Sequence, residues 1–134
     1  MLTPMMIVVA AALIDGDGRV LVQRRPPGAA MAGLWEFPGG KIETYEDPES
    51  ALVRELHEEL AIVVKRAALS PACFASEPLG TRHLLLLVFI CREWSGTPQP
   101  LAATELRWTL PGDLHALDMP HADRPLIPLL QSLL

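Results

Sequence analysis

The chain has 134 residues and a formal net charge of −5 at pH 7, with 50% hydrophobic and 20% charged residues. A chain of this length can form one domain with its own core, so we expect a single domain over residues 1–134. The composition excludes disordered, collagen-like and coiled-coil proteins. The acidic balance argues against binding to duplex nucleic acid, which requires a basic surface.

The cysteines and the apolar segments indicate the compartment. Cys73 and Cys91 lie in apolar stretches without metal-binding spacing, which predicts buried free thiols and a reducing, cytoplasmic location. The longest apolar run, Met5 to Ile14, is shorter than the roughly 20 residues of a membrane helix. A secretory signal would carry a Lys or Arg before its apolar run, and none precedes Met5. We therefore expect no membrane association.

The first elements are expected to be two strands. Residues 6–14 are apolar and rich in β-branched side chains, which predicts a buried strand. The Asp-Gly-Asp-Gly stretch at 15–18 is typical of a turn, and Val20 to Val22 reads as the returning strand. The pattern predicts a hairpin over residues 6–24. Residues 34–37 form a short apolar segment, which Pro38-Gly39-Gly40 ends.

A helix follows, and then more strands. Asp47 before Pro48 predicts a helix start, and leucines at 52, 56 and 60 mark its buried stripe. Residues 61–64 should begin a strand, and strands are also expected over 82–92 and 106–110. Residues 113–117 should form a helical turn, and a final helix should run from Asp123 to about 133. This order predicts a mixed sheet with helices on its faces.

Three glutamates share one side of the central helix. Glu55, Glu58 and Glu59 are separated by three and four positions, so they lie on one arc beside the leucine stripe. Like charges at this spacing destabilise a helix by a few tenths of a kcal/mol per pair. Anions in the last helical turn, here Glu58 and Glu59, each cost roughly 0.3–1 kcal/mol. A bound divalent cation would reverse the sign of these effects, because Mg²⁺ and Mn²⁺ bind carboxylate oxygens. The alternative is a solvated acidic face balanced by Arg54 and Lys41.

The surrounding segment resembles the signature of the Nudix family, GX5EX7REUXEEXGU, where U is aliphatic. The matching positions are Gly40, Glu46, Arg54, Glu55, Leu56, Glu58, Glu59 and Ile62. The departure is Ala61, where the signature has Gly; this is tolerable unless the position has a positive φ, which would cost about 1 kcal/mol. Further similarity to the MutT-like branch lies in LWEFPGGKIE, the preceding arginine pair, Arg82-His83 and the C-terminal D-x-P-L-I. The resemblance covers essentially the whole chain.

The resemblance implies an α/β (α+β) fold, an α/β/α sandwich around a mixed sheet, and hydrolysis of a nucleoside triphosphate to a monophosphate and pyrophosphate. It implies Mg²⁺, with Mn²⁺ as a substitute, held by Glu55, Glu58, Glu59 and the Gly39 carbonyl. Arg54 would orient Glu55, while Gly40 and Glu46 would be structural. The implied substrate-binding residues are Arg24, Arg25, Trp35, Phe37, Arg82 and Asp123. We expect a monomer or homodimer.

A second departure concerns the general base. MutT-like members usually carry a loop glutamate six residues before the Trp of the next strand, and here that position is Ala102. The nearest acidic residue is Glu105. The general base is therefore left open between Glu58, Glu59 and Glu105.

The substrate base also stays open. Similar enzymes read oxidised guanine with an Asn where this chain has Asp123, which as a carboxylate only accepts hydrogen bonds but as a carboxylic acid can also donate. Asp123 could instead be only the cap of the last helix. The first hypothesis is hydrolysis of oxidised purine nucleotides such as 8-oxo-dGTP, and the second is hydrolysis of CTP or 5-substituted dCTP. A third is a non-catalytic nucleotide-binding module.

Overall fold

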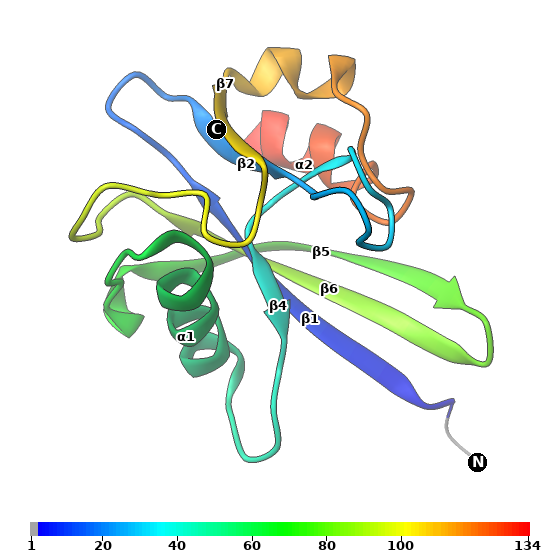
Figure 1. Ribbon diagram of the computed structural model, residues 1–134. Helices are drawn as coiled ribbons and strands as arrows, with labels where there is room; N and C mark the ends of the chain where they lie inside the picture. Colours follow the sequence, from blue (N-terminus) through cyan, green and yellow to red (C-terminus); the bar gives the residue numbers. More distant parts are fainter. Residues whose placement is uncertain (1–2) are drawn as a thin grey trace.

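Two β-sheets and two α-helices make up the structure, a computed structural model that describes residues 3–134 (Figure 1). The larger sheet has the strand order β4-β1-β6-β5. Its strands are β1 (Met5–Leu13), β4 (Gly39–Lys41), β5 (Leu69–Leu79) and β6 (Arg82–Cys91). Because β1 runs parallel to β6 while β4 and β5 run antiparallel to their neighbours, the sheet is mixed, as expected.

The smaller sheet shows that the predicted hairpin over residues 6–24 is wrong. It contains β3 (Trp35–Glu36), β2 (Val20–Arg24) and β7 (Glu105–Thr109), all antiparallel. β1 and β2 share only the isolated Ile14–Val20 bridge and then enter different sheets. The turn itself is confirmed, since the Asp15 side chain accepts hydrogen bonds from two backbone N–H groups. Both strands are apolar on both faces, so each is covered by later parts of the chain.

The alternation of side chains along β1 separates two hydrophobic cores. Val9, Ala11 and Leu13 pack with α1 (Pro48–Leu60), together with the buried stripe Leu52, Leu56 and Leu60. Ala10 and Ala12 point to the other face and pack with α2 (Leu126–Leu133). Helices therefore cover both faces of the sheet, and the predicted α/β/α layering is confirmed (Figure 1).

The helix boundaries follow the local signals. Asp47 is the N-cap of α1 and its carboxylate accepts a 2.8 Å hydrogen bond from the Ser50 backbone N–H. The expected turn near 113–117 is the 3₁₀ helix η2 (Pro111–Ala116). α2 begins only at Leu126 with Pro125 as its N-cap, so Asp123 lies in the preceding turn. Asp123 is therefore not the cap of the last helix.

Two segments differ from the sequence prediction. Residues 61–64 form no strand; Val63 makes one isolated bridge to Ser95, and the 3₁₀ helix η1 (Arg66–Ala68) follows. β5 was not predicted, because Pro71 and Pro78 interrupt its strand pattern. Both prolines are tolerated because β5 is an edge strand, with a register shift after Pro71.

The cysteines and helices bear on the remaining predictions. Both cysteines are free thiols; Cys91 is buried, whereas Cys73 is only half-buried. Within residues 3–134, no helix is long and apolar enough to cross a membrane. The prediction of one domain over 1–134 stays a prediction, and residues 1 and 2 lie outside the described part.

Candidate active site

The loop before α1 is fixed to the helix by one arginine. Arg54 donates two hydrogen bonds of 2.8 Å to the Glu46 carboxylate and one of 2.9 Å to Glu55. It also donates to the Lys41 carbonyl at 3.1 Å and to Glu58 at 3.3 Å. The hydrogen bonds from Arg54 hold the pKa of Glu46 down at about 2. Arg54 thus joins the loop, β4 and the acidic side of the helix.

Two adjacent glycines let β4 approach both β1 and the helix. A Cβ atom on Gly40 would overlap the carboxylate of Glu55, and one on Gly39 would overlap the backbone carbonyl of Val9. No side chain larger than hydrogen fits at either position without moving backbone or Glu55. The glycines therefore bring the β4 backbone against the Glu55 carboxylate.

Glu59 is partly buried and, of the three helix glutamates that the sequence analysis selected, is the one whose pKa is clearly shifted. Its pKa is raised to about 8, mainly because burial removes the carboxylate from water, and the neighbouring Glu55 carboxylate raises it further. The Gln23 side-chain amide on β2 opposes this by donating a 2.5 Å hydrogen bond to Glu59. Glu58, by contrast, is 58% exposed.

Glu55 and Glu59 are of the ligand type that hard divalent cations prefer. Among residues 3–134, no group of three His, Cys, Asp or Glu side chains converges closely enough to hold a metal. Glu55 is nevertheless close enough to Glu59 for its charge to raise the pKa of Glu59. A cation between such oxygens removes this repulsion, and carboxylates are the ligands that Mg²⁺ and Mn²⁺ prefer. The Glu55 carboxylate occupies the space that a side chain at position 40 would need.

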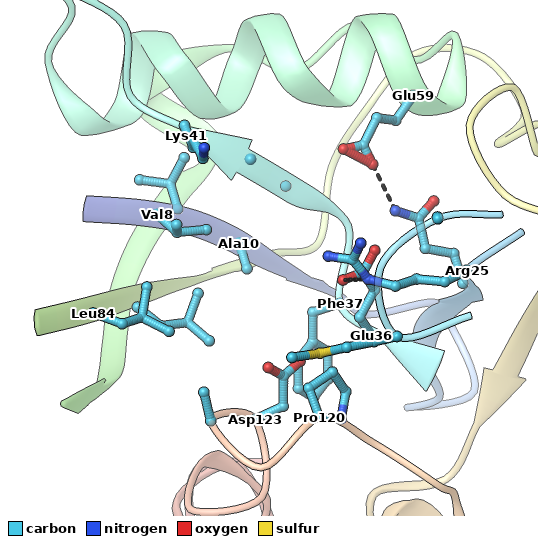
Figure 2. Close-up of a pocket in the computed structure, with 18 of the residues that line it drawn as sticks. Val8, Ala10, Arg25, Glu36, Phe37, Lys41, Glu59, Leu84, Pro120 and Asp123 are labelled. Atoms are coloured by element: carbon cyan, nitrogen blue, oxygen red, sulfur yellow. Dashed lines mark hydrogen bonds and ion pairs between the residues drawn. The ribbon is translucent and has the colours of Figure 1, made fainter. Parts of the chain in front are cut away.

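A cavity of about 540 Å³ extends from Glu59 across the larger sheet to the turn before α2 (Figure 2). Its volume lies within the usual range of small-molecule sites, about 300–1,000 Å³. One end is polar, with Gln23, Gly39, Gly40 and Glu59. The wall formed by β1 and β6 is apolar, with Val8, Ala10, Leu84 and Leu86.

Two more carboxyl groups line the cavity: Asp123 in the turn before α2, and Glu36, whose charge raises the pKa of both Glu59 and Asp123 and which therefore lies between them. Asp123 has its pKa raised to about 7, first by burial and then by the negative charge of Glu36, while Arg25 opposes the shift. Arg25 donates a 3.0 Å hydrogen bond to Glu36, whose own pKa is raised by burial. Figure 2 shows these three side chains around the same opening, with Phe37 behind them.

The family comparison agrees with this geometry. The model of the NUDIX domain matches residues 4–130. The chain belongs to the Nudix family. Similar curated proteins include the CTP pyrophosphohydrolase of Escherichia coli K12, 36% identical over 122 residues, covering 91% of this chain and 89% of that protein. The 8-oxo-dGTP diphosphatase of the same strain is 35% identical over 126 residues, covering 93% of this chain and 96% of that protein.

Solved structures support the same assignment of fold. The E. coli ORF135 protein superposes with a TM-score of 0.86 at 34% identity, covering 98% of this chain and 91% of that one. A MutT Nudix hydrolase from Burkholderia pseudomallei gives a TM-score of 0.81 at 29% identity, covering 94% of this chain and 98% of that one.

Not all predicted site residues of this Nudix domain reach the cavity. Arg24 pairs with Glu105 at 3.2 Å and lies over the ring of Trp35, 5.8 Å from its centroid. Trp35 is buried in the core beside α2 and is covered by Arg107. Arg82 is exposed at the first position of β6. None of these predicted residues lines the cavity, whereas Arg25, Phe37 and Asp123 do.

The structure adds two residues that the sequence analysis missed. Glu36 and Gln23 both line the cavity. Glu36 lies within the LWEFPGG segment, so its neighbours in the motif were a usable signal. Gln23 carried no signal, because a polar residue at the end of an apolar strand usually faces solvent. Ala102 also lines the cavity, whereas Glu105, which pairs with Arg24, is not among the lining residues.

Proposed function

We propose that this Nudix protein is a divalent-metal-dependent nucleoside triphosphate pyrophosphohydrolase that releases a nucleoside monophosphate and pyrophosphate. The observation that carries the proposal is the Glu59 carboxylate in the wall of a nucleotide-sized cavity, with the Glu55 carboxylate close enough to raise its pKa. The names of the relatives support the same reaction class. Two carboxylates brought together at the cost of a raised pKa are best explained by a cation that they bind.

The metal site in this proposal consists of Glu55, Glu58, Glu59 and the Gly39 carbonyl, with Mg²⁺ as the ion and Mn²⁺ as a substitute. When bound, such a cation neutralises phosphate charge and lowers the pKa of water. Arg54 orients Glu55 through its 2.9 Å hydrogen bond, and Glu46 holds Arg54 in place. Arg54 and Glu46 therefore act through the ligands and do not themselves touch the phosphates.

Proton abstraction from the attacking water falls to Glu58 or Glu59 in this proposal. Ala102 has no ionisable group, and Glu105 is paired with Arg24 at 3.2 Å. Glu59 lies in the cavity wall and Glu58 is exposed beside it on the same helix. Glu59 therefore has its carboxylate in the cavity, whereas Glu58 is not among the lining residues and pairs with Arg54 at 3.3 Å.

The opposite end of the cavity binds the base in this proposal. Phe37 offers an aromatic face, and Asp123 with Glu36 offers carboxyl groups for base edges. With a pKa of about 7, Asp123 is present both as an acid and as a carboxylate near neutral pH. As an acid it can donate and accept hydrogen bonds, as an asparagine amide does. This favours 8-oxo-dGTP as the substrate. In this role the enzyme removes oxidised nucleotides before they are used in DNA synthesis.

A second candidate substrate is CTP or a 5-substituted dCTP. The observation that favours it is the pair of carboxylates, because the cytosine amino group donates hydrogen bonds to such acceptors. The similar E. coli CTP pyrophosphohydrolase supports it as well.

As to its setting, we propose a cytoplasmic enzyme, monomeric or homodimeric, that binds free nucleotides and neither duplex nucleic acid nor membranes.

One assay tests these alternatives. The protein is incubated with Mg²⁺ and a panel containing 8-oxo-dGTP, dGTP, CTP, dCTP and 5-methyl-dCTP, and pyrophosphate release is followed. We expect the highest kcat/KM for 8-oxo-dGTP. A preference for cytidine nucleotides would replace the first substrate with the second. Nucleotide binding without pyrophosphate release from any member would instead identify a non-catalytic nucleotide-binding module.

A further inference from the structure

Gln23 is a buried polar side chain at the acidic end of the cavity. It lies on β2 opposite Glu36 of β3, and only 3% of its surface is exposed. Its Nε2 donates a 2.5 Å hydrogen bond to Oε2 of Glu59, which comes from α1, 36 positions later (Figure 2). Another side chain that interacts with Glu59 is the Glu55 carboxyl group, which raises the pKa of Glu59, whereas the Gln23 amide lowers it.

The other half of the same amide has no partner. Oε1 of Gln23 is buried and accepts no hydrogen bond from any of the described residues 3–134. A buried acceptor without a partner costs about 1–3 kcal/mol. As a metal ligand Glu59 is ionised and only accepts hydrogen bonds, so the amide then keeps its N–H group toward Glu59 and its carbonyl away from it. The hydrogen bond from Nε2 to Glu59 therefore comes with an unpartnered Oε1.

Packing alone does not require glutamine here. Leu21 lies two positions earlier on the same face of β2 and is fully buried in the core under α1. A leucine at 23 would continue this apolar row and leave no unpartnered acceptor. The segment between β6 and β7 contributes the methyl group of Ala102 to the cavity lining, and no hydrogen-bonding side chain. Glu59 thus depends on Gln23 for its orientation.

We propose that Gln23 is a positioning residue for the metal site. Its amide N–H fixes the direction of the Glu59 carboxylate. This inference rests on the proposed function, because it assigns Glu59 as a ligand. It adds a residue from the smaller sheet to a site otherwise built on α1 and β4.

The test compares Gln23→Leu, which keeps the volume but removes the hydrogen bond to Glu59, with Gln131→Leu as a control. Gln131 is exposed on α2 and donates to the Pro111 carbonyl at 2.9 Å, away from the cavity. Mn²⁺ affinity is measured without nucleotide by electron paramagnetic resonance. Thermal unfolding in EDTA and the kcat and KM for the best nucleotide of the panel complete the set.

For Gln23→Leu we expect Mn²⁺ binding about 10-fold weaker and kcat about 10-fold lower, as is usual when a partner of a metal ligand is removed. The KM should change less than about 2-fold, and unfolding in EDTA should stay within a few degrees of the wild type. Gln131→Leu should match the wild type throughout. If Gln23→Leu unfolds much earlier, the comparison is made with Gln23→Met, which preserves the unbranched shape.

The two proposals can fail separately. If the wild type hydrolyses nucleotides and a folded Gln23 variant binds Mn²⁺ as tightly as the wild type, the positioning role is overturned. If the wild type hydrolyses nothing but the variant still weakens Mn²⁺ binding, the proposed function fails and the positioning role holds. An equal loss of affinity in Gln131→Leu would also overturn the positioning role.

Discussion

Arg54 and Glu46 are joined by two parallel hydrogen bonds, from Nε to Oε2 and from Nη2 to Oε1, each 2.8 Å long. The geometry is specific to a planar guanidinium, because an ammonium group cannot form both bonds with the same fork. The remaining nitrogen of the guanidinium donates to Glu55 at 2.9 Å. The loop position of Glu46 and the orientation of Glu55 therefore depend on one side chain.

Arg54→Lys should lower activity and stability although the charge is kept. We expect kcat to fall at least about 10-fold, since the Glu55 partner is lost, and the melting temperature to fall by several degrees. The control is Arg66→Lys, whose contacts with Asp47 and Glu49 are half-exposed and should matter little. Equal effects of the two substitutions, in pyrophosphate release and thermal unfolding, would contradict the role of the fork.

Local signals predicted the elements whose cause is local. Asp47 and Pro48 fixed the start of α1, and its leucine spacing fixed the buried face. The hairpin failed because pairing depends on strands far along the chain: β1 pairs with β4 and β6, and β2 with β3 and β7. Nothing near residues 6–24 encodes those partners.

The end of α1 shows a signal that was identified but could not be resolved. Ala61 replaces the family glycine, and its cost depended on φ, which the sequence does not give. The structure places Ala61 at φ +58° as the left-handed C-cap of α1. Ala61 therefore has the strained left-handed conformation, and the cost that the sequence analysis attached to a positive φ applies here.

Ala61→Gly should stabilise the protein. Relief of left-handed strain, less the greater chain entropy of glycine, predicts a gain of about 0.5–1 kcal/mol and a melting temperature a few degrees higher. Ala51→Gly is the matched control within α1, where Ala51 is buried and has no positive φ. That change should lower the melting temperature. A loss of stability in Ala61→Gly would show that the methyl group contributes more than the strain costs.

Glu58→Gln tests the proposed metal site most directly. Removing one carboxylate charge from the set should nearly abolish Mg²⁺-dependent pyrophosphate release and raise the Mg²⁺ concentration needed for half-maximal rate. Folding should be little affected, because Glu58 is 58% exposed. Glu49→Gln, in the first turn of the same helix, is the control and should keep wild-type turnover. Near-full turnover in Glu58→Gln would remove Glu58 from the site.

The sequence predicted the part of the site that lies within the family motif. The spacing of Glu55, Glu58 and Glu59 required only a helix, whereas the side chains that face them come from the other sheet. Gln23 and Glu36 are adjacent across β2 and β3, a pairing that the sequence pattern does not encode. Trp35 and Arg24 were expected at the substrate but pack against each other outside the cavity, because alternation along β2 and β3 turns them to the opposite side from Gln23 and Glu36.

Asp123 should make the stability of the metal-free protein depend on pH. Its pKa is about 7 in the folded state, against an ordinary value of 3.8, because burial and the negative charge of Glu36 disfavour the carboxylate. Between pH 4 and 7 the folded protein therefore holds a proton that the unfolded chain has released. Folding takes up a proton in that window, so the free energy of unfolding falls as pH rises through it.

Asp123→Asn removes this titration while keeping the shape of the side chain. In EDTA, the melting temperature of the variant should match that of the wild type near pH 4 and exceed it increasingly up to pH 8. Asp113→Asn, on exposed η2, serves as the control and should show no such divergence. Because Asn stays neutral at every pH, a constant difference between Asp123→Asn and the wild type would mean that Asp123 is ionised throughout. The carboxyl group would then act at the base only as an acceptor, which favours the cytidine nucleotides over 8-oxo-dGTP.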